Sequence, residues 1–201
     1  DGYVGYFGFP APSINSAGRY NWDKRSWYGD MFTTNYLTTM NAWREIRKAI
    51  NNDEDPRFSM AQILKVAAMH RVTDTYGPIP YLNFGVSKEV PYDSQKDVYY
   101  RFFEELDGAI NNLDSYAASG SKVLSSWDCV FNGDVTSWIK FANSLKLRLA
   151  IRISYANKKL AQEMAESAVK HEFGVIESNE DNAKWNYFGT IPNPLYTAVR
   201  Y

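Results

Sequence analysis

VFNGDVTSWIKFANSLKLRLAIRISY, residues 130–155, carries the clearest structural signal in the sequence. Its large apolar residues recur every three or four positions, the spacing that places side chains along one face of a helix. They are Trp138, Phe141, Leu145, Leu149 and Ile153. Upstream of them, Asn132 or Asp134 can accept hydrogen bonds from the free N–H groups of a first helical turn. We therefore predict one long amphipathic helix whose apolar face is buried.

Four further helices are predicted from the same periodicity, with starts near residues 34, 56, 95 and 158. Asp55 before Pro56 is a helix-start signal, and so is Ser94 with an acidic residue, Asp97, three positions later. The first and second helices, and the fourth and fifth, are joined by short connections, which favours antiparallel pairs. The pattern indicates an all-α fold of stacked helical hairpins with long loops between some of them.

The composition suits one globular domain and excludes several functional classes. The 201 residues are 45% hydrophobic, with 22 basic and 23 acidic side chains. Such a balance argues against nucleic-acid binding, which requires a basic surface that neutralises phosphates. No apolar run approaches the length of a membrane-spanning helix. The single cysteine, Cys129, cannot form an internal disulfide and has no neighbouring Cys or His at metal-ligand spacing.

Aromatic residues are unusually abundant, at 16% of the chain, and many lie in segments without helical periodicity. The run RYNWDKRSWYGD, residues 19–30, mixes aromatic, amide, basic and acidic side chains. Sugars present apolar C–H faces and hydroxyl groups, so carbohydrate sites combine these residue types. The run KWNYFG, residues 184–189, has a similar mixture. The competing interpretation is that these aromatics fill the helical core.

Catalytic and cofactor signals are weak. Neither His70 nor His171 has a nucleophile or an orienting carboxylate at a recognisable spacing, and His171-Glu172 is not the HExxH arrangement of zinc proteases. The sequence lacks phosphate-binding glycine motifs and GxSxG. We therefore expect no cofactor and assign no metal ligand.

Several carboxylates could serve glycoside hydrolysis, so a helical glycoside hydrolase remains an alternative. The candidates are Asp23, Asp30, Glu104, Glu105, Asp128, Asp134 and Asp181. Solvated helix faces and helix caps account for most such residues in any protein. In particular, we expect Glu104, Glu105 and Asp107 to lie off the apolar stripe of their helix.

Three segments in series resemble the SusD/RagB family of Bacteroidetes nutrient-uptake lipoproteins. The first is YGPIP at residues 76–80, and the second is YDS at 92–94 followed by Val98-Tyr99. The third is NGD at 132–134, followed by the framework residues of the quoted helix. Those residues are Trp138, Lys140, Phe141, Ala142, Asn143, Leu145, Arg148 and Leu149. Because order and spacing agree in all three, the chain is identified as a member of this family.

The resemblance implies a tetratricopeptide-like fold and a non-enzymatic role. The protein would be an outward-facing outer-membrane lipoprotein that captures glycan and acts as the lid of a SusC-like TonB-dependent transporter. Some relatives handle peptides or other nutrients, so a mainly structural lid for such cargo remains open. As framework, Asn143 would satisfy buried backbone groups, and Arg148 and Arg152 would pair with carboxylates of a neighbouring helix.

Two departures from the family pattern shape the expected organisation. The lipid-bearing N-terminal cysteine is absent, and relatives are much longer. We expect residues 1–201 to be one domain from the N-terminal part of the family's chain. Within it, residues 1–33 would form an aromatic loop region and residues 34–174 a five-helix scaffold. Residues 175–201 would be irregular and lead toward a missing C-terminal half.

Ligand-binding residues vary within the family, so none transfers by motif. Relatives place binding aromatics in loops before the helical scaffold, which points to the run quoted above. We predict ligand contacts from Asn21, Trp22, Arg25, Trp27 and Tyr28, with Trp185 and Tyr187 as secondary candidates.

Overall fold

A computed structural model describes residues 29–87 and 89–185, and the structural statements below concern those residues. The chain divides into two units, residues 1–34 and 35–201, and the fold is described for the second. The helical elements, in chain order, are α1 (Asp30–Asn35), a π-helical turn η3 (Tyr36–Met40), α2 (Asn41–Ile50), α3 (Pro56–Tyr76), α4 (Gln95–Ala117), α5 (Val135–Arg152) and α6 (Lys158–Val169).

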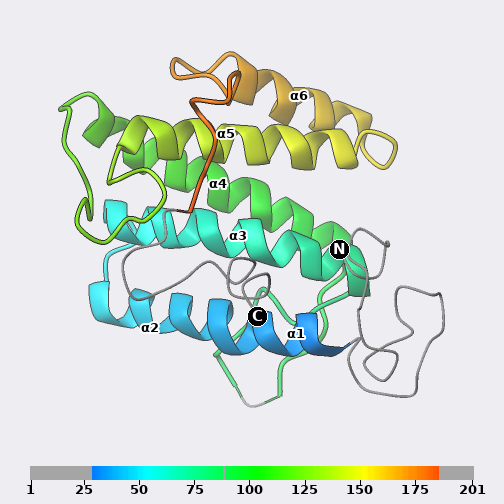
Figure 1. Cartoon of the computed structure of the whole chain (residues 1–201). Coiled ribbons are helices and arrows are strands. Elements are labelled where there is room, and N and C mark those ends of the chain that lie inside the picture. The colour runs from blue at the N-terminus through cyan, green and yellow to red at the C-terminus, as the bar shows by residue number, and fades with distance from the viewer. Residues whose placement is uncertain (1–28, 88, 186–201) are drawn as a thin grey trace, which may run out of the picture. The chain divides into compact units, whose positions relative to one another are not determined.

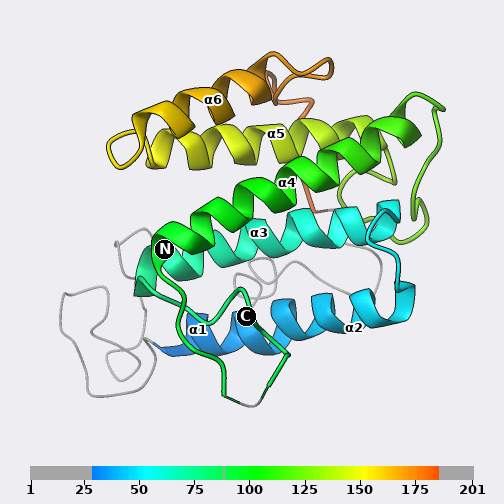
Figure 2. The same ribbon diagram turned by 180° about the vertical axis from the view of Figure 1, so that it is seen from behind.

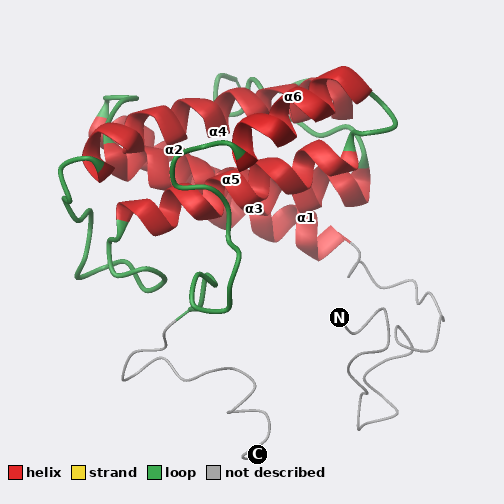
Figure 3. Cartoon of the chain, turned by 90° about the horizontal axis from the view of Figure 1, so that it is seen from above, coloured by secondary structure: helices red, strands yellow, loops and turns green. Residues whose placement is uncertain are grey.

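Helices α2 to α6 stack in the order of the chain, and each runs antiparallel to the one before it (Figures 1 and 2). Long loops precede α4 and α5 and extend from the helical stack (Figure 3). Within the described residues there is no strand, only isolated bridges that join Ile79 to Asp93 and Lys122 to Asp134. The predicted all-α fold of stacked helical hairpins is confirmed. None of the described helices is long and apolar enough to cross a membrane.

Short-range side-chain caps explain where four of these helices begin. Asp55 accepts a hydrogen bond from the backbone N–H of Arg57, and Pro56 occupies the first helical position of α3. Helices α4, α5 and α6 are capped in the same way, by Ser94, Asp134 and Asn157. Each cap satisfies N–H groups that the helix itself leaves unpaired. The predicted caps at Asp55 and Ser94 are confirmed, and of the two candidates for α5 the structure selects Asp134.

Helix α5 buries most of its predicted apolar face. Its buried members are Trp138, Leu145, Leu149 and Ile153, whereas Phe141 is half-buried. Asn143, also buried, donates to the backbone carbonyl of Gly174 at 3.0 Å, as its expected framework role requires.

Two expectations about individual side chains are wrong, because neighbouring elements rather than helical spacing decide burial. Arg152 pairs with Asp74 of α3 at 2.8 Å as expected, but Arg148 is exposed and has no carboxylate partner among the described residues. Helical spacing predicts Leu64 on one apolar side of its helix with Met60 and Ile63, but Leu64 is 48% exposed.

The loop before α5 is held by one buried carboxylate, Asp128. Its oxygens accept hydrogen bonds from the backbone N–H groups of Val130, Phe131 and Gly133 at 2.8–3.2 Å, and from the indole of Trp138 at 2.8 Å. Gly133 has φ +78°, and a Cβ there would lie 2.6 Å from the carbonyl oxygen of Val123. Only glycine fits this turn without strain.

Helix boundaries differ modestly from the predictions. The helical segment expected from residue 34 begins at Asp30 and includes the π-helical turn. Apolar periodicity marks the buried middle of a helix. The exposed terminal turns of a helix and the π-helical turn do not show this periodicity.

Candidate functional site

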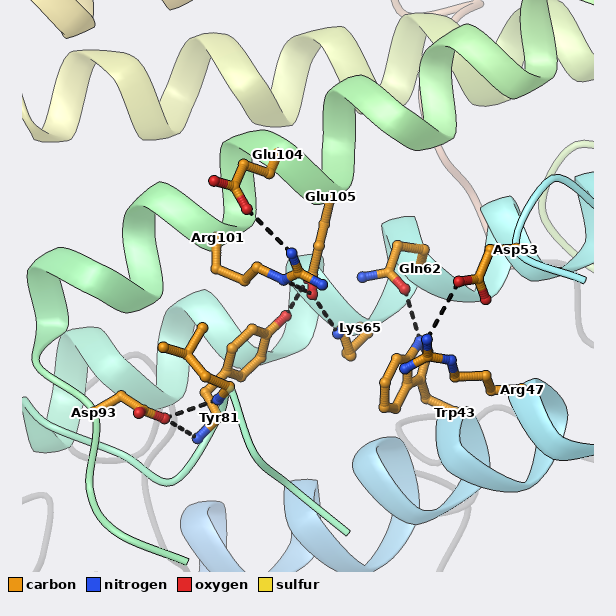
Figure 4. A network of polar contacts seen from close by, with 11 residues as sticks. Trp43, Arg47, Asp53, Gln62, Lys65, Tyr81, Asp93, Arg101, Glu104 and Glu105 are labelled. Carbon is orange, nitrogen blue, oxygen red and sulfur yellow. Dashed lines mark hydrogen bonds and ion pairs between the residues drawn. The ribbon is translucent and has the colours of Figure 1, made fainter. Parts of the chain in front are cut away.

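Helices α2, α3 and α4 border a groove of about 250 Å³. Trp43 and Arg47 come from α2, Phe58 and Gln62 from α3, and Arg101 from α4. The walls therefore combine aromatic, amide and charged side chains. Figure 4 shows the polar network at one side of this groove.

A buried ion pair forms the centre of the network. Lys65 Nζ of α3 lies 2.8 Å from Glu105 Oε1 of α4, and the two side chains are 2% and 8% exposed. Glu105 also accepts from the hydroxyl of Tyr81 at 2.5 Å and from Arg101 Nε at 3.1 Å. Both carboxylate oxygens of Glu105 thus accept hydrogen bonds, and two cations lie beside the carboxylate, as a buried ion requires.

Tyr81 reaches Glu105 because the connector between α3 and α4 is pinned. Asp93 Oδ2 accepts from the backbone N–H groups of Tyr81 and Leu82, both at 2.8 Å (Figure 4). Asp93 belongs to the YDS segment quoted above. This motif therefore sets the position of an aromatic ring in the network.

Two aromatic rings flank the ammonium of Lys65. Its Nζ lies 3.8 Å from the ring centre of Trp43 and 4.6 Å from that of Tyr81. Burial lowers the pKa of Lys65 to about 8, although the charge of Glu105 and their hydrogen bond raise it. The ring faces compensate part of the lost hydration of the ammonium.

Gln62 links Trp43 to the same region. The indole Nε1 of Trp43 donates to Gln62 Oε1 at 2.8 Å, which fixes the orientation of the amide because an indole N–H can only donate. The amide nitrogen points away from Trp43 (Figure 4) and has no hydrogen-bond partner among the described residues. At the rim, Arg47 pairs with Asp53 at 3.2 Å and Arg101 with Glu104 at 3.1 Å.

A larger pocket of about 740 Å³ lies where α3 and α5 end and α4 begins. There the Tyr99 hydroxyl donates to Asp74 at 2.6 Å and accepts from Arg152 Nε at 3.2 Å. Nearby, Asn157 donates to the hydroxyl of Tyr100 at 2.9 Å. This pocket has the volume usual for small-molecule sites, roughly 300–1,000 Å³, whereas the groove falls just below that range.

We predict that replacing Tyr99 with phenylalanine makes the free energy of unfolding fall less steeply as pH rises in the alkaline range. Burial and the hydrogen bond to Asp74 raise the pKa of Tyr99 to about 12. Above its ordinary pKa of about 10, the unfolded chain releases this phenolic proton while the folded chain keeps it. Stability contributed by Tyr99 is therefore complete below pH about 10 and is lost as pH rises toward 12.

Urea unfolding across this pH range measures the effect, with Tyr155→Phe as an exposed control. Tyr36 and Tyr81, whose pKa values burial also raises, leave a residual slope in the variant. An identical slope in Tyr99→Phe and the parent protein would contradict the assignment.

The predicted ligand-binding residues Asn21, Trp22, Arg25, Trp27 and Tyr28 lie outside the described residues, as does Tyr187. Trp185 is described and is 57% exposed. The two pockets above bring together other residues, so the predicted set stays a prediction.

Each of the two histidines lies beside a polar group of another residue in the fold. His70 is buried, and its Nδ1 lies 3.2 Å from the carbonyl oxygen of Val66. His171 Nε2 lies 3.3 Å from Asp114. Within the described ranges, no three His, Cys, Asp or Glu side chains are grouped so that they could hold a metal ion.

Sequence reasoning missed the network around Glu105 and placed this residue wrongly. We expected it off the apolar stripe of its helix, but its side chain is buried against α3. The available signal was Lys65, a charged residue within the apolar run QILKVAAM, residues 62–69. A lysine at a core position requires a buried partner.

Comparison with known proteins identifies the chain. A family model described as "SusD-like: Susd and RagB outer membrane lipoprotein" matches residues 1–201. The chain belongs to this family. Membership confirms the resemblance drawn from the three motifs and the predicted location at the outer membrane. Among curated proteins, none matches the chain.

Solved structures of SusD homologs agree with this SusD-like fold. A homolog from Bacteroides uniformis is 49% identical, with a TM-score of 0.69 over 87% of this chain and 33% of that one. One from Bacteroides vulgatus is 34% identical, with a TM-score of 0.80 over 90% and 37%. A chitin-binding homolog from Flavobacterium johnsoniae is 39% identical, with a TM-score of 0.73 over 76% and 32%. The chain thus spans about a third of the length of these relatives.

Proposed function

We propose that this SusD-like protein captures glycan at the outer membrane and acts as the lid of a SusC-like TonB-dependent transporter. The observation that carries the proposal is family membership together with 39% identity to a chitin-binding SusD homolog. An N-terminal lipid would hold the protein at the membrane. Chitin oligosaccharides are accordingly the first ligands to test.

A binding role without catalysis is supported by how the buried carboxylates are used. Glycoside hydrolases place two carboxyl groups on either side of the scissile bond. Glu105 is taken up by Lys65, Tyr81 and Arg101, and Asp128 by the loop it holds. Both carboxylates thus stabilise the fold and are not available to a substrate.

For the glycan contacts we propose the loop residues Asn21, Trp22, Arg25, Trp27 and Tyr28, with Trp185 and Tyr187 as secondary contacts. The exposed ring of Trp185 offers an apolar face to a sugar. Aromatic rings and polar side chains in one run match the two kinds of surface that a sugar presents.

Isothermal titration calorimetry of the whole protein with chitin oligosaccharides and a panel of other glycans tests the proposal. We expect binding, and a loss of about tenfold or more in affinity for Trp22→Ala and Trp27→Ala, because each removes a stacking surface. Co-purification with a SusC-like transporter tests the lid role.

Three results would overturn parts of this proposal. Absence of glycan binding while the transporter takes up its cargo normally removes the glycan role. Release of reducing sugar, abolished by one carboxylate substitution, replaces the binding protein with a hydrolase. Binding of peptides in place of glycans leaves the lid role but changes its cargo.

A further inference from the structure

The pocket of about 740 Å³ at one end of the helical stack has no assigned role. Residues from the C-terminal ends of α3 and α5 and from the N-terminal end of α4 line it. These three helix ends lie on the same side of the stack (Figure 1). Its polar lining consists of Asp74, Gln95, Lys96, Tyr99, Tyr100, Arg152 and Asn157.

The acceptors of this pocket are largely occupied. Asp74 uses one oxygen for the Tyr99 hydroxyl and the other for Arg152 Nη2 at 2.8 Å. The side-chain oxygen of Asn157 accepts from the N–H of Leu160. The carbonyl of Ile153, beyond the end of α5, accepts from two backbone N–H groups. Gln95 is the exception. Its amide nitrogen donates to the Thr73 carbonyl, and its amide oxygen has no donor among the described residues.

The donors, in contrast, are partly unused. Tyr100 accepts from Asn157, and its own hydroxyl hydrogen has no acceptor in the described part of the chain. Arg152 donates through Nε and Nη2, which leaves Nη1 without a described partner. The ammonium of Lys96 lies 5.5 Å from the ring centre of Tyr100, with no carboxylate bound to it in that same part. The pocket therefore offers several donors and few acceptors.

Charge reinforces this imbalance. Lys96 and Arg152 are cationic, and Asp74 is the one acidic group among the described lining residues. Since Asp74 is already neutralised by Arg152, the ammonium of Lys96 gives the lining a net positive charge. A ligand that matches this pocket carries negative charge and supplies acceptor oxygens.

The ring of Tyr100 indicates the shape of that ligand. Its hydroxyl is held by Asn157 and its face lies near Lys96, so the ring is positioned before any ligand arrives. A half-buried aromatic ring beside hydrogen-bond donors suits a sugar, whose C–H face stacks on it. The pocket thus combines a sugar-stacking surface with a site for an anion.

We propose that this pocket binds an acidic sugar residue, with the sugar ring on Tyr100 and its carboxylate between Lys96 and Arg152. The free amide oxygen of Gln95 accepts from a sugar hydroxyl. The proposal rests on the proposed glycan-binding function and extends it, because it names a second subsite and the class of sugar that the subsite selects.

Glucuronic acid and glucose differ at one carbon, so they form a matched pair of probes. Saturation-transfer NMR with the whole protein is expected to show glucuronate binding about tenfold more tightly than glucose at low salt, the gain typical of a charge-assisted hydrogen bond. Added salt reduces this preference. The side-chain amide signal of Asn157 shifts on binding, since Asn157 holds the Tyr100 ring.

Three variants separate the roles of the groups. Lys96→Gln is expected to lower glucuronate affinity several-fold and leave glucose unchanged, because only the charge is lost. Tyr100→Leu lowers the affinity for both sugars, because the stacking surface is lost. Lys48→Gln, an exposed lysine of α2, is the matched control and leaves both affinities unchanged.

Equal affinity for the two sugars would overturn the proposal, as would an equal effect of Lys96→Gln and Lys48→Gln. Inorganic sulfate binding as tightly as glucuronate would identify a simple anion site and overturn the sugar assignment. Oligosaccharide binding lost in Trp22→Ala but normal in Tyr100→Leu would leave the proposed function intact while rejecting this subsite. Thermal unfolding of each variant confirms that it folds.

Discussion

Glu105→Ala is expected to lower the free energy of unfolding by about 3–5 kcal/mol, because it leaves the buried ammonium of Lys65 without its counter-charge. The hydroxyl of Tyr81 loses its acceptor in the same step. The ring faces beside Lys65 compensate only part of this loss. Chemical denaturation followed by circular dichroism measures the change.

Glu104→Ala is the matched control for this prediction. Glu104 neighbours Glu105 on α4 and pairs with the same arginine, Arg101, but its side chain is 66% exposed. An exposed ion pair contributes about 0–1 kcal/mol, so the control is expected to change stability little. Equal losses in the two variants would show that burial does not govern this ion pair.

A double variant tests how much of the stability lost in Glu105→Ala comes from leaving the buried ammonium of Lys65 unpaired. Lys65→Met with Glu105→Gln removes both charges, while glutamine keeps an acceptor for Tyr81. We expect this double variant to be more stable than Glu105→Ala, because no isolated charge remains in the interior. If the double variant is the less stable of the two, the unpaired ammonium is not the main cost of Glu105→Ala.

Asp128→Ala is expected to cost about 4 kcal/mol, because it leaves three backbone N–H groups and the indole of Trp138 without acceptors. The loop before α5 would lose its internal support. Asp53→Ala, in which an exposed carboxylate is removed, serves as the control. Comparable losses in both would refute the role given to Asp128.

Acid unfolding gives a second measure of Asp128. Burial raises the pKa of this carboxyl, but the hydrogen bonds from Trp138 and the loop backbone outweigh burial and hold it below its usual value. The contribution of Asp128 is therefore complete above pH about 4 and is lost as pH falls through the lowered pKa. Asp128→Asn is expected to unfold with a weaker dependence on acid than the parent protein.

Helices and their caps were predictable because they depend on residues close in sequence. Ser94 and Asp97 are three positions apart, and the backbone N–H of Asp97 donates to the Ser94 hydroxyl in the first turn of α4. Residues 132–134 predicted the start of a helix, and Asp134 caps that helix. The family resemblance followed from the same local patterns, since it depends on the order and spacing of short motifs.

The pockets were not predictable from such patterns. Lys65 and Glu105 are 40 positions apart, and the acidic pocket partner Asp74 lies far in sequence from Arg152. Whether a charged residue is buried depends on which helix packs against it. The local sequence around the residue does not specify that neighbouring helix. This explains why Glu105 was assigned to the solvated side of its helix.

The sequence by itself determined the all-α stack of helices through periodicity and capping, which act within a few residues, and the SusD-like family through the order and spacing of short motifs. Tertiary structure alone decided where charge is buried and where donors remain unused. The buried ion pair joins α3 to α4, and the unused donors lie where the ends of α3 and α5 come close to the start of α4 (Figure 1). Lys96, Tyr100 and Arg152 form one candidate sugar subsite only because the stack places them around the same space.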